Sequence, residues 1–161
     1  MKTRGDSDFV MTSGPQPLLR EPEDALTSGM TPTPTPETAP FWEAAKYDRL
    51  LIQRCRSCVL HYFYPRPFCP RCASADVEWD VVSGRGRLVS YVIDYRPMPP
   101  TDGAVPLIIA LVELDEGVRL LTNIVDAAPD PDALPLDAPV SVAFQPRGDV
   151  KLPVFRLVGA Q

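Results

Sequence analysis

Residues 55–72 read CRSCVLHYFYPRPFCPRC. This stretch holds all four cysteines of the chain, in two C-x-x-C pairs that ten residues separate: Cys55, Cys58, Cys69 and Cys72. Two such pairs place their thiolates on tight turns that can converge on one ion, and four thiolates complete a tetrahedral zinc site without an open position for a substrate. The stretch therefore predicts a structural zinc ribbon, with rubredoxin-type iron as the alternative metal.

A ribbon of this size depends on its metal. About 35 residues bury too small a core to fold alone, so the ion supplies much of the stability. Thioredoxin-like exchange is the least favoured use of the thiols, because it needs a single C-x-x-C on a helix after a strand of an α/β fold. In a reducing compartment disulfides seldom persist, and this also favours a metal site over bridges.

Two residues of the ribbon depart from the usual pattern. Glycine often follows the second cysteine of each pair, where the backbone turns left-handed, whereas this chain has Val59 and Ala73 there. We expect local strain or altered turns at these positions, with a metal affinity below the usual one as a further alternative.

The composition predicts a soluble protein. The 161 residues carry a formal net charge of −5 and are 45% hydrophobic, which suffices for one ordinary domain or two very small ones. No stretch approaches the roughly 20 apolar residues of a membrane-spanning helix, and Asp6 and Asp8 stand where a secretory signal has its apolar core. We therefore expect a cytoplasmic protein without a membrane segment.

Residues 1–38 predict a disordered or polyproline-like tail. Seven of the twenty prolines lie within the first forty residues, and Thr31–Pro36 alternates threonine with proline. Such a segment forms neither helix nor ladder and buries too little apolar surface to offset its loss of entropy. A proline-rich ligand for a partner domain is a weaker alternative. Met11 and Met30 leave open a natural start further along the chain.

Residues 39–75 are expected to form a short helix followed by the ribbon. Pro40 suits the start of a helix. The side chains of one helical face then recur at three- and four-residue spacing: Phe41, Trp42, Ala45 and Arg49. The spacing predicts a helix of about two turns that docks an aromatic side chain against the following segment.

Residues 76–161 predict a β barrel, which makes the chain mainly β. The run 76–95 alternates apolar and polar side chains and is interrupted at Gly84 and Gly86, which indicates one long, bent first strand. A hairpin around Asp115–Gly117 and two C-terminal strands bring the number of strands to five. This arrangement is typical of an OB fold, although the periodicity also allows an SH3-like barrel or an open sandwich.

The charge is uneven along the chain. Residues 1–40 carry −3, residues 41–75 carry +4 and residues 76–161 carry −6. The acidic barrel disfavours single-stranded nucleic acid, which needs several Lys or Arg along its groove. A phosphorylated small molecule or an acidic protein surface suits the arginines of the ribbon better: Arg54, Arg56, Arg66 and Arg71. Simple solvation is the plain alternative for each of them.

The sequence contains no recognisable catalytic motif. It has no G-x-S-x-G, no phosphate-binding glycine loop and no H-E-x-x-H. His61 is expected to be a surface or packing residue, because the four cysteines suffice for the metal. It is also the only ordinary candidate for proton transfer near neutral pH, and the sequence shows no partner for it. These observations favour a module that binds over one that catalyses.

Five stretches resemble the family catalogued as domain of unknown function 35, in that family's order and spacing: FWEAAKYDRLLIQRCRSC, YPRPFCPRC, VEWDVVSGRGRLVSYVI, VPLIIALVELDEGVRLLTNIV and LPVFR. The resemblance runs from about residue 40 to the end. It implies a short helix, a rubredoxin-like zinc ribbon and a C-terminal OB fold, with zinc at the four cysteines. Members of the family resemble non-catalytic companions of acyl-CoA enzymes, namely thiolases, condensing or acyltransfer enzymes, lipid-transfer-protein-type aldolases of steroid side-chain breakdown and MaoC-type hydratases.

The resemblance therefore implies an accessory subunit of a heteromeric complex, whose ribbon and barrel loops help form the entrance for CoA. CoA carries three phosphate groups, and we expect Arg54, Arg66 and Arg71 to lie near that entrance. The aromatic run Tyr62–Tyr64 is expected to contact the thiolase-fold or MaoC-type partner, although three successive aromatics cannot all face one small core. The rival functions are a single-stranded nucleic-acid binder and a stand-alone acyl-CoA hydrolase with His61 as its base.

Overall fold

The computed structural model describes residues 31–96 and 106–159. Most of the expected N-terminal tail, with the alternative starts at Met11 and Met30, lies outside the described residues. In chain order the elements are α2 (Ala39–Lys46), β1 (Leu51–Cys55), β2 (His61–Tyr62), β3 (Val77–Val81), β4 (Arg85–Asp94), β5 (Leu107–Leu114), β6 (Arg119–Ile124), the 3₁₀-helix η1 (Pro131–Ala133), β7 (Pro139–Arg147) and β8 (Val150–Leu157).

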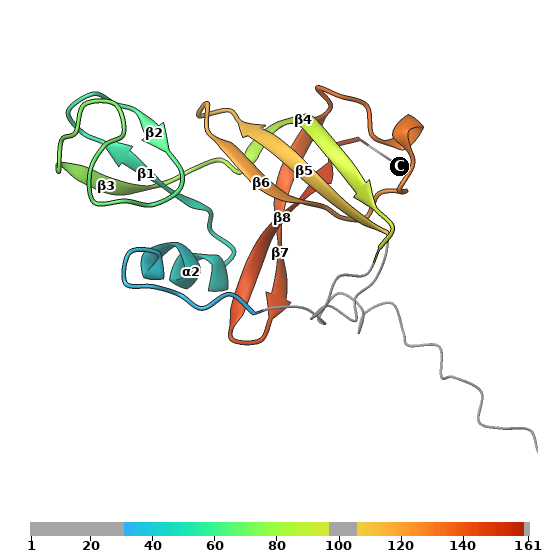
Figure 1. Ribbon diagram of the computed structural model, residues 1–161, viewed down its shortest axis with the longest axis horizontal. Coiled ribbons are helices and arrows are strands. Elements are labelled where there is room, and N and C mark those ends of the chain that lie inside the picture. Colours follow the sequence, from blue (N-terminus) through green and yellow to red (C-terminus); the bar gives the residue numbers. More distant parts are fainter. Residues whose placement is uncertain (1–30, 97–105, 160–161) are drawn as a thin grey trace, which may run out of the picture.

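The strands form two separate sheets (Figure 1). One is a three-stranded antiparallel sheet with the order β2-β1-β3, and the other is a closed barrel with the order β4-β5-β6-β8-β7. Within the barrel, β6 and β8 run parallel and the other neighbours antiparallel. The prediction of a mainly β chain, in which a short helix and a ribbon precede a five-stranded OB-type barrel, is confirmed.

The prediction of one long first barrel strand is wrong. Residues 76–95 form two strands in different sheets, because β3 pairs with β1 of the ribbon, from Leu51 opposite Val81 to Cys55 opposite Val77. The chain then turns at Gly84, whose φ of 67° favours glycine, and a Cβ there would overlap the side chain of Val142. Only after this turn does β4 join β5 and β7.

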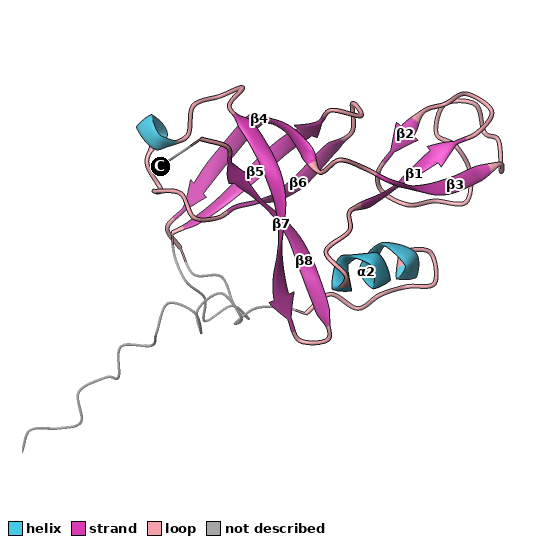
Figure 2. Cartoon of the chain, turned by 180° about the vertical axis from the view of Figure 1, so that it is seen from behind, coloured by secondary structure: helices cyan, strands magenta, loops and turns pink. Residues whose placement is uncertain are grey.

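Helix α2 joins the ribbon to the barrel. Its buried residues, Phe41 and Ala45, are four positions apart and therefore lie on one face. The helix packs against β8 and β1. The ring of Phe41 lies 4.9 Å from that of Trp42 and 5.5 Å from that of Phe63, a residue of the ribbon. The expected two-turn helix with a docked aromatic is thus present, and Figure 2 shows it on the same side of the barrel as the ribbon sheet.

One hydrophobic core spans the helix, the base of the ribbon and the barrel. Phe41, Leu50 and Ile52 belong to the same buried cluster as the barrel residues Leu88 and Phe155. Since Leu88, Val112 and Phe155 of the barrel strands are fully buried, the barrel interior is filled by side chains. A second, smaller cluster consists of Cys55, Cys69 and Tyr62. The ribbon tip therefore has almost no apolar core apart from its cysteines.

The described part of the N-terminal segment, residues 31–38, contains neither helix nor strand. It runs beside α2 and the turn between β7 and β8, where Thr31 lies against Gly148. Of the helices in the described ranges, none has the length and apolar character to cross a membrane.

Candidate metal centre

The four cysteines lie on two loops with the same hydrogen-bonding pattern. Cys55 ends β1, and its backbone N–H donates to Leu60 O at 2.9 Å while its carbonyl accepts from Val59 N at 2.9 Å. Cys69 repeats this pattern, donating to Ser74 O at 2.9 Å and accepting from Ala73 N at 3.0 Å. Each loop thus turns its two cysteines toward the same point.

The four sulfur atoms have the spacing of a tetrahedral metal site. All lie within 4.8 Å of one another; Cys58 and Cys69 are 3.5 Å apart, and Cys55 and Cys72 are 3.6 Å apart. A tetrahedral zinc ion with Zn–S bonds of about 2.3 Å separates its sulfurs by roughly 3.8 Å. The cysteines therefore fit a four-sulfur zinc site, as the sequence predicted, and zinc held in this way has no open position for a substrate.

The pKa values of two thiols of the cluster are shifted in opposite directions. Burial raises the pKa of Cys69, but hydrogen bonds from the backbone N–H groups of Cys72 and Arg71 outweigh it and lower that pKa to about 6. A backbone hydrogen bond from Ser74 acts to lower the pKa of Cys72, whose residue is exposed, but desolvation of the sulfur within the cluster and the neighbouring thiols raise it to about 12. Since adjacent thiolates repel one another, all four sulfurs lose their protons together only when a cation balances them.

Both loops contain a left-handed residue after the second cysteine. Val59 has a φ of 59° and Ala73 a φ of 58°. The turns are therefore not altered by the missing glycines; instead, two residues with side chains adopt a conformation that costs L-amino acids about 1–2 kcal/mol. The expected strain is present, whereas the lower metal affinity stays a prediction.

Hydrogen bonds with two buried side chains of the ribbon sheet hold the loop between the cysteine pairs. Gln53 of β1 is buried, and its Oε1 accepts from the backbone N–H of Arg66 at 2.7 Å. The hydroxyl of Tyr62, which is also buried, donates to the carbonyl of Arg66 at 3.3 Å. Of the aromatic run, only Tyr64 is largely exposed, at 61%, because Tyr62 packs on the cysteines and Phe63 on the main core.

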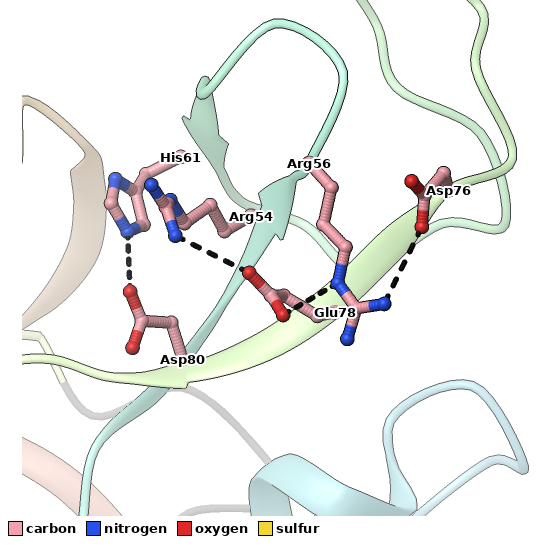
Figure 3. Close-up of polar contacts among 6 residues, drawn as sticks. All are labelled: Arg54, Arg56, His61, Asp76, Glu78 and Asp80. Carbon is pink, nitrogen blue, oxygen red and sulfur yellow. Dashed lines mark hydrogen bonds and ion pairs between the residues drawn. The ribbon is translucent and has the colours of Figure 1, made fainter.

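Two of the arginines that were expected to bind phosphate form ion pairs with carboxylates on or beside β3 (Figure 3). Arg54 Nη1 donates to Glu78 Oε1 at 3.3 Å, and Arg56 Nε donates to Glu78 Oε2 at 2.7 Å. Arg56 also lies 3.7 Å from Asp76. Hydrogen bonding to Glu78 raises the pKa of Arg56. Arg54, one of the three residues expected near CoA, is therefore already paired with a carboxylate.

Arg66 and Arg71 lie on the loop between the cysteine pairs, and both are exposed. Arg66 Nε donates to the carbonyl of Tyr64 at 3.3 Å, and the backbone N–H of Arg71 lies 3.4 Å from Cys69 Sγ. Among residues 31–96 and 106–159, neither guanidinium forms a salt bridge. These two cations are free to meet a phosphate or a carboxylate, while their common position with Arg54 around one entrance stays a prediction.

His61 has the partner that the sequence did not reveal. Its Nε2 lies 2.9 Å from Asp80 Oδ2 (Figure 3). His61 is on β2 and Asp80 on β3, so this contact reaches across the central strand β1. Asp76, Glu78 and Asp80 are spaced two apart on or beside β3, so they point to one face of the sheet. This spacing was the signal in the sequence that could have revealed acidic partners for His61 and the arginines. With these three residues, the net charge of residues 41–81 falls to +1, so the ribbon is far less basic than its own segment suggests.

Comparison with known proteins matches both halves of the described chain. The sequence model of the domain described as "ChsH2, rubredoxin-like zinc ribbon domain" matches residues 42–78. That of "ChsH2, C-terminal OB-fold domain" matches residues 79–145. The two domains follow one another in the order that the structure shows.

Two curated relatives differ in how much of them the chain covers. The "Probable enoyl-CoA hydratase alpha subunit" of Thermomonospora curvata is 43% identical over 120 residues, which are 72% of this chain and 36% of that protein. The chain therefore spans about a third of that subunit. The "DUF35 domain-containing scaffold protein" of Methanothermobacter thermautotrophicus is 33% identical over 112 residues, which are 68% of this chain and 82% of that protein.

A solved structure has the same fold over nearly its whole chain. It is described as "Ltp2-ChsH2(DUF35) aldolase", and its matching chain is 38% identical with a TM-score of 0.70. The match covers 79% of this chain and 98% of that one.

Proposed function

We propose, because the chain belongs to the DUF35 family of ChsH2-type zinc-ribbon and OB-fold proteins, that it is a non-catalytic accessory subunit of an acyl-CoA-processing enzyme. The observation that carries the proposal is the match to 98% of a chain from the Ltp2-ChsH2(DUF35) aldolase. An aldolase or a hydratase is thus the favoured partner, and a thiolase-fold or MaoC-type enzyme is the corresponding fold class. We place the complex in the cytoplasm.

The metal would hold the ribbon in shape. Cys55, Cys58, Cys69 and Cys72 would bind zinc as four thiolates and close its coordination sphere, so the ion supplies folding energy to the ribbon. Residues of the ribbon sheet would then position the loop between the cysteine pairs. Gln53 and Tyr62 fix the loop that presents Arg66 and Arg71.

The two free arginines support a role at the CoA entrance. Arginine forks bind phosphate oxygens in pairs, and a protein that shapes the mouth of a partner's active site would meet the phosphates of CoA there. Arg54 belongs to the same proposal but contributes less, because phosphate must compete with Glu78 for its guanidinium. The acyl chain of the substrate would lie in the partner.

Affinity capture of the full chain from its natural host, with metal analysis of the same sample, tests the accessory role. We expect an aldolase, hydratase or thiolase-fold enzyme to co-purify, with about one zinc ion per chain. A chain that emerges alone and binds oligonucleotides in a salt-dependent manner would support the nucleic-acid alternative. Thioester hydrolysis by the isolated chain, abolished in His61→Ala, would support the hydrolase alternative.

Titration of CoA into the captured complex tests the entrance. Arg66→Ala and Arg71→Ala should each weaken CoA binding by about tenfold, the loss expected for one charged hydrogen-bonded pair. Arg96→Ala is the matched control, because Arg96 is 93% exposed and lies at the far end of β4. Unchanged CoA affinity in both ribbon variants would remove the arginines from the entrance and leave the accessory role standing.

A further inference from the structure

The closed barrel has its fewest paired residues between β6 and β8. These strands pair through a single residue pair, Ile124 opposite Phe155, with a hydrogen bond from Val125 N to Phe155 O at 2.9 Å. A parallel ladder uses every second residue of a strand, so the next donor on β8 would be Pro153, which has no N–H. The ladder therefore stops there, and the carbonyl of Pro153 accepts instead from the side-chain hydroxyl of Thr122 at 2.9 Å.

The backbone of Leu121 faces this gap. The hairpin between β5 and β6 begins with a hydrogen bond from Leu114 N to Val118 O at 2.8 Å. Because paired residues alternate along an antiparallel ladder, Leu120 and Thr122 bond to β5, whereas the N–H and C=O of Leu121 point away from it. The register contains no β8 residue opposite Leu121. Its side chain is also 67% exposed.

An apolar groove follows the gap. It has a volume of about 260 Å³ and is lined by β6, β8, α2 and the start of the ribbon loop. None of its fifteen lining residues is charged. Trp42 of α2 and Tyr64 of the ribbon loop form aromatic walls, and Leu121 lies at the strand edge. Figures 1 and 2 show the ribbon and α2 on the same side of the barrel. The ribbon loop, α2 and the barrel strands can therefore line one groove.

We infer that this groove receives an extended segment of the partner enzyme, which adds as a strand to β6 and places an apolar side chain between Trp42 and Tyr64. The inference rests on the proposed accessory function and names the surface through which it operates. An exposed strand edge offers main-chain hydrogen bonds to an added strand, and neighbouring pockets select its side chains.

The properties of the groove select this occupant over others. Its volume of about 260 Å³ lies below the roughly 300–1,000 Å³ of small-molecule sites, which disfavours a ligand as large as a steroid. The uncharged lining does not suit the phosphates of CoA or of a nucleic acid. An amphipathic helix would leave the backbone of Leu121 unpaired, since a helix uses its own N–H and C=O groups internally. An extended segment satisfies both the apolar walls and the strand edge.

Residue-resolved amide hydrogen exchange tests the strand addition directly. The ¹⁵N-labelled full chain is measured alone and in the complex with the captured partner. Strand addition slows the exchange of the Leu121 amide by at least about tenfold and leaves Leu120 and Thr122 little changed, because β5 already protects them. An unchanged Leu121 amide in a complex that forms overturns the inference while the accessory function stands. Slow, concentration-dependent exchange in the chain alone overturns it in favour of a second copy.

Substitutions at the same residue separate the side chain from the backbone. Leu121→Ala removes the apolar side chain, and Leu121→Pro removes in addition an N–H that β5 does not use. We expect partner affinity to fall about tenfold in the first and further in the second. Leu136→Ala is the matched control, because Leu136 is 60% exposed and lies outside the groove. Equal affinity of all three variants and the unmodified chain refutes the docking surface, whereas capture of no acyl-CoA enzyme at all refutes the proposed function.

Discussion

Replacing Val59 by glycine should stabilise the protein. Val59 follows the second cysteine of the first pair and has a φ of 59°, in the left-handed region that favours glycine. Most exposed valines respond in the opposite way, because glycine loosens the unfolded chain and loses β propensity. Val59→Gly thus tests whether the two loops of the metal site store backbone strain.

The size of the effect follows from three contributions. For a β-branched residue the left-handed backbone conformation costs about 2 kcal/mol, the upper end of the range, and glycine removes this cost. Greater freedom of the unfolded chain costs about 0.7 kcal/mol. Val59 is 59% exposed, so its lost contacts cost only about 0.6 kcal/mol. We therefore expect a net gain of about 0.7 kcal/mol in the free energy of unfolding. Ala73→Gly should gain less, because alanine pays the lower end of the same cost, about 1 kcal/mol.

Val92→Gly is the matched control. Val92 is 57% exposed and lies in β4, where its backbone is extended. It bears the same losses without relief of strain, so we expect a loss of about 1.3 kcal/mol. Urea unfolding at a fixed excess of zinc measures both variants, since bound metal itself adds to stability. Equal destabilisation of the two variants would mean that Val59 stores no strain.

Three further outcomes are expected. Removal of zinc by a chelator should unfold the ribbon tip, whose buried cluster is separate from the main core, while the barrel keeps its β-sheet circular dichroism; a single loss of all structure would contradict this separation. Gly86→Ala should destabilise the barrel by more than about 2 kcal/mol in thermal unfolding, because its Cβ would overlap the carbonyl oxygen of Glu113; an unchanged Tm would refute that contact. Hydrogen bonds from Arg87 and Arg119 lower the pKa of Glu113. The stabilisation that ionised Glu113 provides is therefore fully present above pH 4.5, the ordinary pKa of a glutamate, and is lost as the pH falls through the lowered pKa. Glu113→Gln should reduce stability at pH 7 and lose this effect in acid; a pH-independent difference would exclude the ion pairs.

The metal site could be predicted because its geometry is local. Each pair of cysteines spans four residues, and a short turn brings both sulfurs to one side whatever the rest of the chain does. The same holds for α2, where Phe41 and Ala45 lie one turn apart on a helix that has Pro40 in its first turn. Here the sequence pattern and the structure agree because neighbouring residues decide both.

The surroundings of the arginines could not be predicted in the same way. Glu78 lies 24 residues after Arg54, and they meet only because β3 pairs with β1 and not with the barrel. An alternating pattern gives the faces of a strand but does not identify its neighbour. The charge of a continuous segment therefore overstated how basic the ribbon is. The groove beside β6 was equally inaccessible, since it depends on where a proline interrupts the ladder between two distant strands.

The groups that the described structure offers to a partner lie on its surface. Four sulfurs close the metal, Asp80 holds His61, and side chains such as Phe155 fill the barrel. Within the described ranges, the exposed side chains of Arg66 and Arg71 and the backbone of Leu121 on β6 stay available to a partner. The ribbon loop joins the two, because Tyr64 lines the groove and Arg66, two residues later, is fixed to β1 through Gln53. In the proposed function, the zinc ribbon would therefore hold the groove beside β6 and the loop with Arg66 and Arg71 at a fixed distance from each other.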